Sequence, residues 1–560
     1  QSFSIIYFSF LILYILPIYS LPDFFDNIIL NKYVLIMFSL QLFCIIIIHY
    51  FTNFCIEFLN FYVIIFLIEV IILNNNENEI MIQFFEWYLP ADCSLWNTAY
   101  KEASYLSKAG FNYIWLPPAY KASSGIKDVG YGVYDLYDLG EFDQKGAIPT
   151  KYGTKNGYLD AIQALHENGL KVVADIVFNQ KMGADETEKV IAIEDNPTNR
   201  TEEVAEPHEI VAWTKFTFPG RGNTYSPFKW NWTHFHGVDW DESEKKSSVF
   251  RFYGKHWDEL VDKENGNFDY LMGCDVDLNN VDVVEELTNW GKWYLDLTKV
   301  DGFRIDAVKH IRASFFEDWL KSLNEYSQKS LFTVGEYWSG NIESLTSYLD
   351  KTNRMISLFD VPLHYNFFNA CHSDGNYDMR TIFNGTLVGT CPDKAVTFVD
   401  NHDTEPDQSL ASWIDDWFKP LAYSLILLRK DGLPTVFYGD LYGIPSKNIS
   451  DKKNMLEKLL YLRKNIAYGV QTDYFNDSHI IGWVREGDTA HPNSGLVVIM
   501  TNSIGGCLQM NVGKSLANTV LYDYTGNLKE PVYVDNDGNG IFYVDGGSVS
   551  VWTKIQPQDD

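Results

Sequence analysis

The chain has 560 residues, of which 46% are hydrophobic and 21% are charged, the balance of a globular protein. This length predicts two or three structural units rather than one small core. Lys and Arg total 44 against 74 Asp and Glu, so the formal charge is −30. A field of this sign repels phosphate backbones and anionic lipid heads, which argues against nucleic acid as a partner and leaves neutral polymers and hard cations compatible.

Aromatic residues and cysteines both bear on the class of protein. Trp (16), Tyr (35) and Phe (37) bring the aromatic fraction to 16%. Most of these rings are needed for packing, and the remainder suit stacking on the flat faces of sugars. The seven cysteines include no Cys-x-x-Cys pair and no regular spacing, which argues against a disulfide framework and a zinc cluster. Free thiols favour a reducing compartment, so we expect a cytoplasmic protein rather than a secreted one.

Residues 1–79 form an apolar N-terminal segment that differs from the rest of the chain. Residues 5–19, 33–48 and 61–73 are each apolar enough for a marginal membrane helix, but basic residues to orient such helices are nearly absent. The segment shows no signal-peptide pattern. We interpret it as translated flanking sequence or a mis-joined gene model. A membrane anchor is the alternative, and only then would a membrane be a partner.

From residue 80 onward, short apolar runs alternate with amphipathic stretches of helical period. Eight runs are predicted as β-strands, and stretches such as 158–168 and 284–297 are predicted as the helices between them. This order is typical of an α/β fold, the (β/α)8 or TIM barrel, whose chemistry lies at the carboxyl ends of the strands. The predicted strands are residues 80–85, 112–116, 171–177, 302–305, 332–336, 356–359, 395–399 and 434–437.

Two further regions are predicted outside the barrel. The third and fourth strands are too far apart for a loop, so residues 181–280 are expected to form an inserted B domain. The barrel would then comprise residues 80–180 and 281–464. Short β patterns dominate afterwards, which predicts a C-terminal antiparallel β domain over residues 465–560. Its clearest strand patterns are residues 480–484, 495–501 and 547–554.

Acidic side chains follow three of the predicted strands. Asp306 comes at the end of the fourth strand, Glu336 at the end of the fifth, and Asp403 just beyond the seventh. Any one of them is equally well explained as a helix cap, but capping does not explain three in this order. Because the strand ends of a barrel meet at one face, these carboxyls should lie close together. Cleavage of a glycosidic bond needs two such groups, about 5–5.5 Å apart when the anomeric configuration is retained.

The segments that carry these acids resemble the signature regions of the α-amylase family of glycoside hydrolases. The resemblance runs in register over residues ~80–555 and is strongest to the bacterial-type liquefying and intracellular α-amylases. It implies endo-acting hydrolysis of internal α-1,4-glucosidic bonds in starch, glycogen or malto-oligosaccharides. The matching segments are residues 83–88, 130–138, 175–180, 302–310, 334–338, 398–404 and 546–550.

The resemblance implies a role for each of the three acids. Asp306 is expected to attack the anomeric carbon and form a covalent glycosyl-enzyme. Glu336 is expected to protonate the leaving oxygen and then to deprotonate water. Asp403 would bind sugar hydroxyls and stabilise the cationic transition state. Arg304, two residues before Asp306 on the same strand face, would keep the nucleophile ionised and oriented.

The resemblance also implies substrate contacts around these acids. Tyr131 would stack on the sugar that is cleaved, and His402 would hydrogen-bond the same sugar. Lys309 and His310 would contact the leaving-group side. Gln180 departs from the family pattern, which usually has a His that binds the reacting sugar at this position. A Gln amide still donates a hydrogen bond but carries no charge, so activity is expected to be reduced or its optimum shifted.

The family places a calcium ion between the barrel and the inserted domain, and oxygen ligands of the kind that calcium prefers occur at the matching positions. Some relatives add a second calcium and a sodium. Asp258 and Asp277 match acids of that cluster, but His236 stands where another Asp is expected. We therefore predict one Ca²⁺, which would tie the insert to the barrel. Its ligands would be Asn179, Asp269, Asp275 and the backbone carbonyl of His310.

Two alternatives from other classes remain open at this point. One is a non-catalytic, membrane-anchored relative, which the three intact acids oppose. The other is a transglycosylase on the same scaffold, because the two reactions differ only in whether water or a sugar accepts the glycosyl group. In the hydrolytic interpretation we expect a monomer whose partner is an α-glucan or malto-oligosaccharide substrate.

Overall fold

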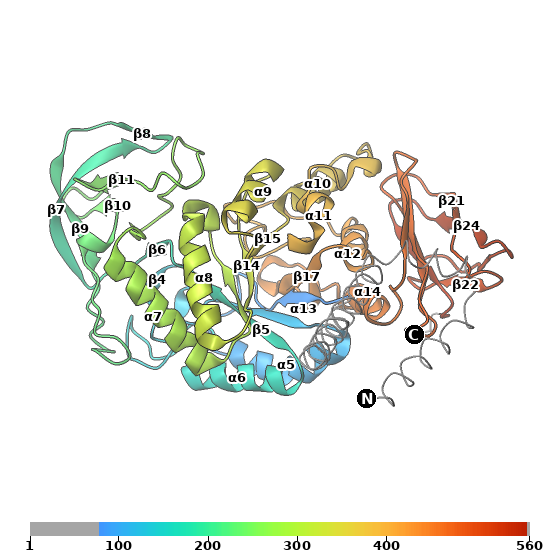
Figure 1. Cartoon of the computed structure of the whole chain (residues 1–560), viewed down its shortest axis with the longest axis horizontal. Coiled ribbons are helices and arrows are strands. Elements are labelled where there is room, and N and C mark those ends of the chain that lie inside the picture. Colours follow the sequence, from blue (N-terminus) through green and yellow to red (C-terminus); the bar gives the residue numbers. More distant parts are fainter. Residues whose placement is uncertain (1–77, 557–560) are drawn as a thin grey trace, which may run out of the picture. The chain divides into compact units, whose positions relative to one another are not determined.

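The computed structural model describes residues 78–556. Eight parallel strands close into a barrel in the order β1-β17-β16-β15-β14-β13-β5-β2 (Figure 1). Every predicted barrel strand is present, with ends that differ from the prediction by at most two residues. Such strands are buried on both faces, which is why continuous apolar runs mark them. They are β1 (Met81–Gln83), β2 (Tyr113–Leu116), β5 (Lys171–Ile176), β13 (Gly302–Ile305), β14 (Phe332–Gly335), β15 (Ser357–Phe359), β16 (Ala395–Phe398) and β17 (Leu433–Phe437).

Helices pack around the barrel, and their buried faces follow the helical period. In α7 (Val281–Thr298), Val283, Leu287 and Trp290 are buried at spacings of three or four, and the Asn280 side chain caps the first turn by accepting a backbone hydrogen bond. The two helical stretches predicted from sequence correspond to α6 and α7. The other α-helices of the described part are α5 (Leu95–Ala109), α6 (Lys155–Glu167), α8 (Ala313–Ser327), α9 (Ile342–Lys351), α10 (Val361–Cys371), α11 (Leu387–Thr390), α12 (Lys419–Leu427), α13 (Tyr438–Tyr442) and α14 (Lys453–Asn465).

Between β5 and β13 the chain forms a five-stranded antiparallel sheet, which Figure 1 shows at the end of this unit away from the C-terminal strands. The long strand β7 pairs with β8, β9 and β11, and the ladder of β6 with β12 connects the sheet to the barrel. The sheet lies within the range predicted for the inserted domain. The strands outside the barrel up to this point are β3 (Lys121–Ala122), β4 (Val133–Asp135), β6 (Gln180–Lys181), β7 (Glu186–Asn196), β8 (Asn199–Glu203), β9 (His208–Lys215), β10 (Gly237–Asp241), β11 (Lys246–Phe252) and β12 (Cys274–Asp275).

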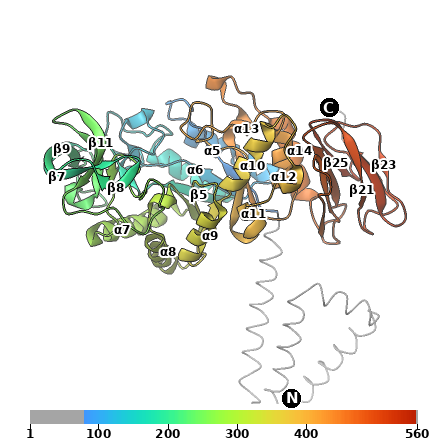
Figure 2. The same cartoon turned by 90° about the horizontal axis from the view of Figure 1, so that it is seen from above.

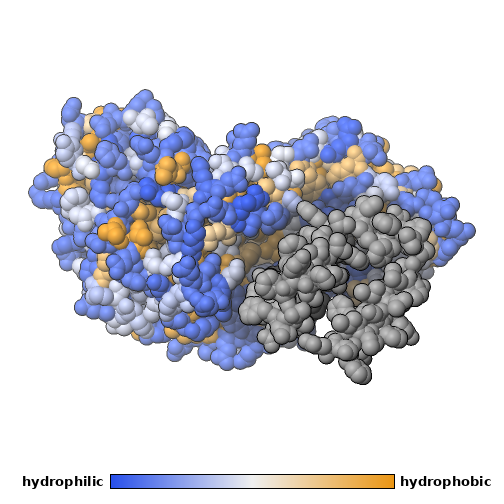
Figure 3. Space-filling view, in the orientation of Figure 1, coloured by the Kyte–Doolittle hydropathy of each residue, from blue (hydrophilic) through white to orange (hydrophobic). Residues whose placement is uncertain are grey.

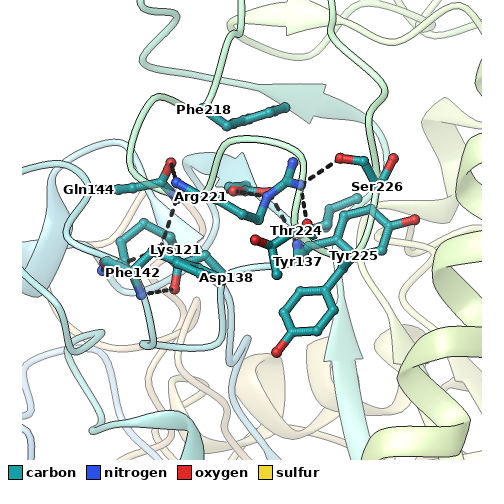
Figure 4. Close-up of polar contacts among 12 residues, drawn as sticks. Lys121, Tyr137, Asp138, Phe142, Gln144, Phe218, Arg221, Thr224, Tyr225 and Ser226 are labelled. Atoms are coloured by element: carbon teal, nitrogen blue, oxygen red, sulfur yellow. Dashed lines mark hydrogen bonds and ion pairs between the residues drawn. The ribbon is translucent and has the colours of Figure 1, made fainter.

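A buried polar network joins the inserted region to the loops after β2 (Figure 4). Arg221 of the insert donates from Nε to Asp135 Oδ2 at 2.7 Å. Gln144 Nε2 donates to the same oxygen at 3.0 Å and to Asp138 Oδ2 at 2.9 Å. Lys121 lies 3.6 Å from Asp138, and both side chains are fully buried. Because each carboxylate is paired with a cation and hydrogen-bonded, the network holds the insert against the barrel loops without an unpaired buried charge.

The chain after α14 forms two antiparallel sheets, of six and of two strands, which lie beyond α12 and α14 in Figure 2. A small apolar core that includes Val497, Phe542 and Trp552 lies between them. The three strand patterns predicted for this region correspond to β19, β20 and β25. The strands are β18 (Gln471–Tyr474), β19 (Ile480–Arg485), β20 (Leu496–Thr501), β21 (Gly506–Asn511), β22 (Val520–Asp523), β23 (Val532–Tyr533), β24 (Asn539–Val544) and β25 (Val549–Thr553).

The predicted N-terminal segment, residues 1–79, lies outside the described residues except for its last two. Asn78 Nδ2 donates to the backbone carbonyl of Arg463 at 3.0 Å, and Glu79 accepts a hydrogen bond from Lys171 Nζ at 2.9 Å. These two residues therefore belong to the folded unit, which begins at Asn78. The interpretation of the earlier residues stays a prediction, as do the domain boundaries at 181, 280 and 465.

The surface of the described part is largely polar. Outside the grey atoms, hydrophilic residues cover most of the face drawn in Figure 3, and apolar residues form smaller patches between them. This distribution agrees with the large excess of acidic residues in the sequence. None of the helices between residues 78 and 556 is long and apolar enough to cross a membrane.

Candidate active site

The three acids predicted to be catalytic lie at the carboxyl end of the barrel. Asp306 directly follows β13, Glu336 directly follows β14, and Asp403 lies in the loop after β16. Ile305 lies opposite Gly335 in the parallel register, so Asp306 and Glu336 leave neighbouring strands at the same level. Glu336 N donates to Ile305 O at 2.9 Å, which keeps the two strand ends together.

Arg304 is the central cation of this site and is fully buried. Its Nη1 lies 2.9 Å from Asp175 Oδ1 and 2.8 Å from Asp306 Oδ1. Its Nη2 lies 2.8 Å from Glu336 Oε1. Asp175 is the direct neighbour of Arg304 across β5 and β13. Because a guanidinium keeps its proton and presents a rigid planar fork, one fixed charge orients all three carboxylates.

The acids outnumber this fixed cation, and burial shifts their pKa values. Burial raises the pKa of Asp306 to about 7, although Arg304 opposes the shift. Burial also raises the pKa of Asp175 to about 6. The pKa of Asp403 lies well above its ordinary value, because the group is buried and stands beside Glu336. Burial therefore favours the protonated forms of Asp306, Asp175 and Asp403, and Arg304 offsets this effect only in part.

An aromatic wall, formed by Trp87, Tyr131 and His402, stands beside the acids. Tyr131 O–H donates to Asp175 Oδ2 at 2.9 Å, and its ring stacks on His402 with 5.1 Å between centroids and 5° between planes. Trp87 is nearly parallel to both rings. His402 Nδ1 lies 3.1 Å from the amide nitrogen of Gln83, which only donates, so the neutral ring carries its hydrogen on Nε2. Burial lowers the pKa of His402 well below its usual range, so the ring is neutral.

Two further predicted substrate contacts lie around this wall. Gln180 Nε2 donates to the backbone carbonyl of Tyr131 at 3.1 Å, and its Oε1 has no hydrogen-bond partner among the described residues. Lys309 Nζ lies 2.7 Å from Glu264 of the insert and donates to Trp338 O at 3.0 Å. Gln180 therefore lies against the backbone of Tyr131, whereas Lys309 bridges the loop after β13, the insert and the loop after β14.

The residues predicted to bind calcium come together where the insert meets the barrel. The pairing of β6 with β12 places Asp275 opposite Gln180, the residue that follows Asn179. His310 Nδ1 donates to the backbone carbonyl of Phe268 at 2.6 Å, next to Asp269. Burial lowers the pKa of His310 to about 3, so its ring is neutral. The ring thus contacts the insert.

His236 lies among these predicted ligands and is almost fully buried. Its Nδ1 lies 2.9 Å from Asp275 Oδ2 and 3.1 Å from Asp269 Oδ2, and its Nε2 lies 3.0 Å from Asp277 Oδ1. Burial disfavours the charged ring, but these carboxylates raise the pKa of His236 well above its usual range. Lys255 also pairs with Asp277, and the carboxylates of Asp269 and Asp275 supply oxygen donors beside the charged ring. With the amide oxygen of Asn179, this donor set fits a hard cation such as Ca²⁺.

The comparisons with known protein families decide what this architecture is. Residues 99–473 match the family model described as the α-amylase catalytic domain, and residues 496–553 match the α-amylase C-terminal domain. The chain belongs to the α-amylase family. The first match spans most of the barrel and the whole insert, so the family, the TIM-barrel fold and the glycosidase class expected from the sequence are confirmed.

Individual relatives show how similar this chain is to known α-amylases. The α-amylase of Geobacillus stearothermophilus is 57% identical over 477 residues, covering 85% of this chain and 87% of the relative. The cytoplasmic α-amylase of Escherichia coli (strain K12) is 43% identical over 489 residues, covering 85% of this chain and 98% of the relative. The solved structure of an Anoxybacillus α-amylase aligns with a TM-score of 0.58 at 17% identity, covering 86% of this chain and 98% of the other. That last likeness supports the fold alone.

Four residues of this α-amylase site received no individual role from the sequence. Asp175, Gln83 and Trp87 lie inside segments that match the family, so the sequence marked their positions without giving them a function. Glu405 lies one residue beyond such a segment, and the sequence did not mark its position. Its side chain accepts a hydrogen bond from Trp87 N, which lies 318 positions away in the chain.

Proposed function

We propose that this α-amylase cleaves internal α-1,4-glucosidic bonds of starch, glycogen and malto-oligosaccharides with retained configuration, with Asp306 as nucleophile and Glu336 as general acid and base. The contact of one buried guanidinium, that of Arg304, with both carboxylates carries the proposal. A retaining mechanism needs two neighbouring carboxyls in fixed orientations, and a shared cation supplies this arrangement.

In the first step, Asp306 attacks the anomeric carbon while Arg304 holds Oδ1 and leaves Oδ2 for the new bond. The glycosidic carbon–oxygen bond breaks, and the leaving oxygen takes the proton of Glu336. In the second step, the Glu336 carboxylate takes a proton from water, and the resulting hydroxyl displaces Asp306 from the anomeric carbon. Both carboxyls return to their starting protonation, so the cycle is balanced.

The surrounding groups are proposed to bind the sugar. Asp403 Oδ2 lies 3.4 Å from His402 Nε2, so an acceptor and a donor stand side by side for neighbouring sugar hydroxyls. Tyr131 offers its ring face to the sugar that is cleaved. Gln180 has a free carbonyl oxygen and a second amide hydrogen with which to reach the same sugar. Lys309 stands on the side of the Glu336 loop, where the leaving group departs.

We further propose that one Ca²⁺ is bound by Asn179, Asp269, Asp275 and the backbone carbonyl of His310. The oxygen donors of Asn179, Asp269 and Asp275, all of them buried, support this assignment. When bound, the ion links the end of β5, the insert and the loop after β13, and it takes no part in the bond cleavage. His236 contacts the Oδ2 atoms of Asp269 and Asp275. It therefore occupies the position from which a further cation would bind these oxygens.

We also infer a monomer in the cytoplasm. All the residues proposed for catalysis come from one chain, so activity needs no partner subunit. Disulfides persist in oxidising compartments, and the cysteines of the described part are free thiols. They are Cys93, Cys274, Cys371, Cys391 and Cys507.

The direct test is product analysis on soluble starch. Internal cleavage should lower the chain length before glucose or maltose accumulates, and proton NMR should show α-anomers as the first products. First products with the β-configuration would contradict the retaining mechanism. Elongated oligosaccharides in place of net hydrolysis would indicate a transglycosylase, and an absence of cleavage would contradict the proposal altogether.

A further inference from the structure

Glu405 lies in the loop after β16, two residues beyond Asp403, and its side chain is fully buried. Its Oε1 accepts a hydrogen bond from Trp87 N at 2.9 Å. Its Oε2 has no hydrogen-bond partner among residues 78–556. A buried carboxylate with an unpartnered oxygen is unfavourable, whereas a carboxylic acid keeps its proton on that oxygen.

The charged groups that face Glu405 do not neutralise it. Lys151 is engaged elsewhere, because its Nζ donates to Trp87 O at 3.2 Å. The neighbours therefore present more negative than positive charge to this carboxyl. The titratable groups that face it are Glu86, Asp400, Asp403 and Lys151.

Burial and this surplus of acids shift the ionisation of the pair formed by Glu405 and Glu86. Burial first, and then Glu86, raises the pKa of Glu405 to about 9. Burial raises the pKa of Glu86 to about 7, although Lys151 opposes the shift. At neutral pH Glu405 is therefore an uncharged acid, while Glu86 begins to carry charge. Above about pH 9 both carboxyls are negative, close to Asp403.

Glu405 holds the loop after β1, which carries one side of the aromatic wall. The indole of Trp87 lies 6.1 Å from each of the other two rings of that wall, with interplanar angles of 2° and 8°. The next residue repeats the connection, because Tyr88 O–H donates to Pro406 O at 2.7 Å. Two successive residues of the β1 loop are thus tied to two successive residues of the β16 loop.

We propose that Glu405 is a positioning residue that works as an uncharged acid: it holds Trp87 in the aromatic wall, and loss of its proton sets the upper pH limit of α-glucan cleavage. The ionised form places a second negative charge beside Glu86 and Asp403, and their repulsion loosens the two loops that support the wall. The inference rests on the catalytic roles proposed above and adds a group that touches neither the substrate nor the reacting atoms.

The Glu405→Gln variant separates the proton from the shape of this side chain. The amide still offers an oxygen to Trp87 N and has no proton to lose. The pH profile of kcat/KM on a malto-oligosaccharide, measured from about pH 5 to 10, should fall above about pH 9 in the wild type. In the variant this alkaline limb should move up by a pH unit or more, so the ratio of kcat/KM at pH 10 to that at pH 7 should be at least about fivefold higher than in the wild type. A limb that stays in place or moves down overturns the proposal.

The Glu86→Gln variant is the matched control, with an effect of opposite sign. Removing the charge of Glu86 makes the ionisation of Glu405 easier, so the alkaline limb should move to lower pH. If the alkaline limb originates instead at the general acid, both variants remove a nearby negative charge and both shift it downward. Shifts in the same direction therefore overturn the proposal.

Infrared difference spectra provide a reading that does not depend on turnover. The wild type should show a carbonyl band of a protonated carboxyl at pH 7 that disappears by about pH 10 and is missing from the Glu405→Gln variant. Failure to see this change overturns the inference. Failure of the catalytic assignment is distinguishable, because the Asp306→Asn variant would then still cleave starch whatever the Glu405→Gln profile shows.

Discussion

Two clusters in this α-amylase have a similar arrangement of charges and different consequences. In each, one buried cationic side chain faces three carboxylates, which come from three separate barrel strands around Arg304 but from one short segment, residues 269–277, around His236. The Arg304 cluster contains Asp175, Asp306 and Glu336, and the His236 cluster contains Asp269, Asp275 and Asp277.

The two clusters differ in how burial shifts the pKa values of their carboxyls. Arg304 stands on a barrel strand, where burial raises the pKa of Asp306 to about 7 and that of Asp175 to about 6. His236 stands in the insert beside β12, where burial and the neighbouring Asp269 raise the pKa of Asp275 to about 8. A divalent ion would bind the carboxylate oxygens there. Similar sets of charged side chains can therefore support catalysis on rigid strands, or hold two parts of the chain together at a domain junction.

The largest effect is expected when the nucleophile of the Arg304 cluster is replaced. Asp306→Asn replaces a carboxylate by an amide that does not attack the anomeric carbon, so kcat on starch should fall on the order of 10⁴-fold or more while oligosaccharide binding survives. Steady-state kinetics and a binding titration measure the two properties. The exposed Asp318→Asn on α8 is the control. A variant that kept a tenth of wild-type activity would show that the nucleophile lies elsewhere.

The next effect tests whether the shape of the cation matters as well as its charge. Arg304→Lys keeps one positive charge but loses the fork that reaches Asp306 and Glu336 together. We expect kcat to fall on the order of 100-fold or more, with a smaller change in KM. Arg380→Lys, at an exposed ion pair with Asp378, should change neither constant. Near-normal kcat in Arg304→Lys would mean that charge alone orients the acids.

The His236 cluster is tested through its metal content. Purified protein should contain about one Ca²⁺ per chain, and chelation should remove about 4 kcal/mol of stability when free calcium is about a thousand times its Kd. His236→Asp frees the oxygens of Asp269 and Asp275, so it should bind more calcium and lose more stability on chelation. Elemental analysis and thermal melts measure these properties, with His256→Asp as the control. A wild type without calcium would contradict the ligand assignment, and one with three ions would show that His236 does not prevent binding at the second site.

The smallest expected effect concerns the edge of the aromatic wall. Gln180→His should raise kcat about fivefold, because a stronger donor near the developing positive charge of the sugar is worth roughly 1 kcal/mol. The Gln180 side chain already lies against Tyr131, so the fold should be preserved. Kinetics on malto-oligosaccharides measure the gain, with the exposed Gln163→His as control. A loss of activity would show that the surrounding pocket has adapted to Gln.

The sequence by itself determined the barrel, the inserted sheet and the C-terminal sheets. Buried parallel strands require continuous apolar runs, and these are local features that can be read along the chain. The acids were also local features, because Asp306 and Glu336 directly follow two such runs. Their meeting at one face follows from the parallel topology alone.

Only the tertiary structure decided how side chains pair across the fold. Nothing local indicates that Arg304 contacts Glu336, that the His310 ring turns towards Phe268, or that Glu405 meets Trp87. The charge of His236 likewise depends on acids brought to it by the bridge between Phe235 and Val276. Side-chain directions and ionisation depend on strand register, burial and neighbours that are distant in the sequence, and these exist only once the chain has folded.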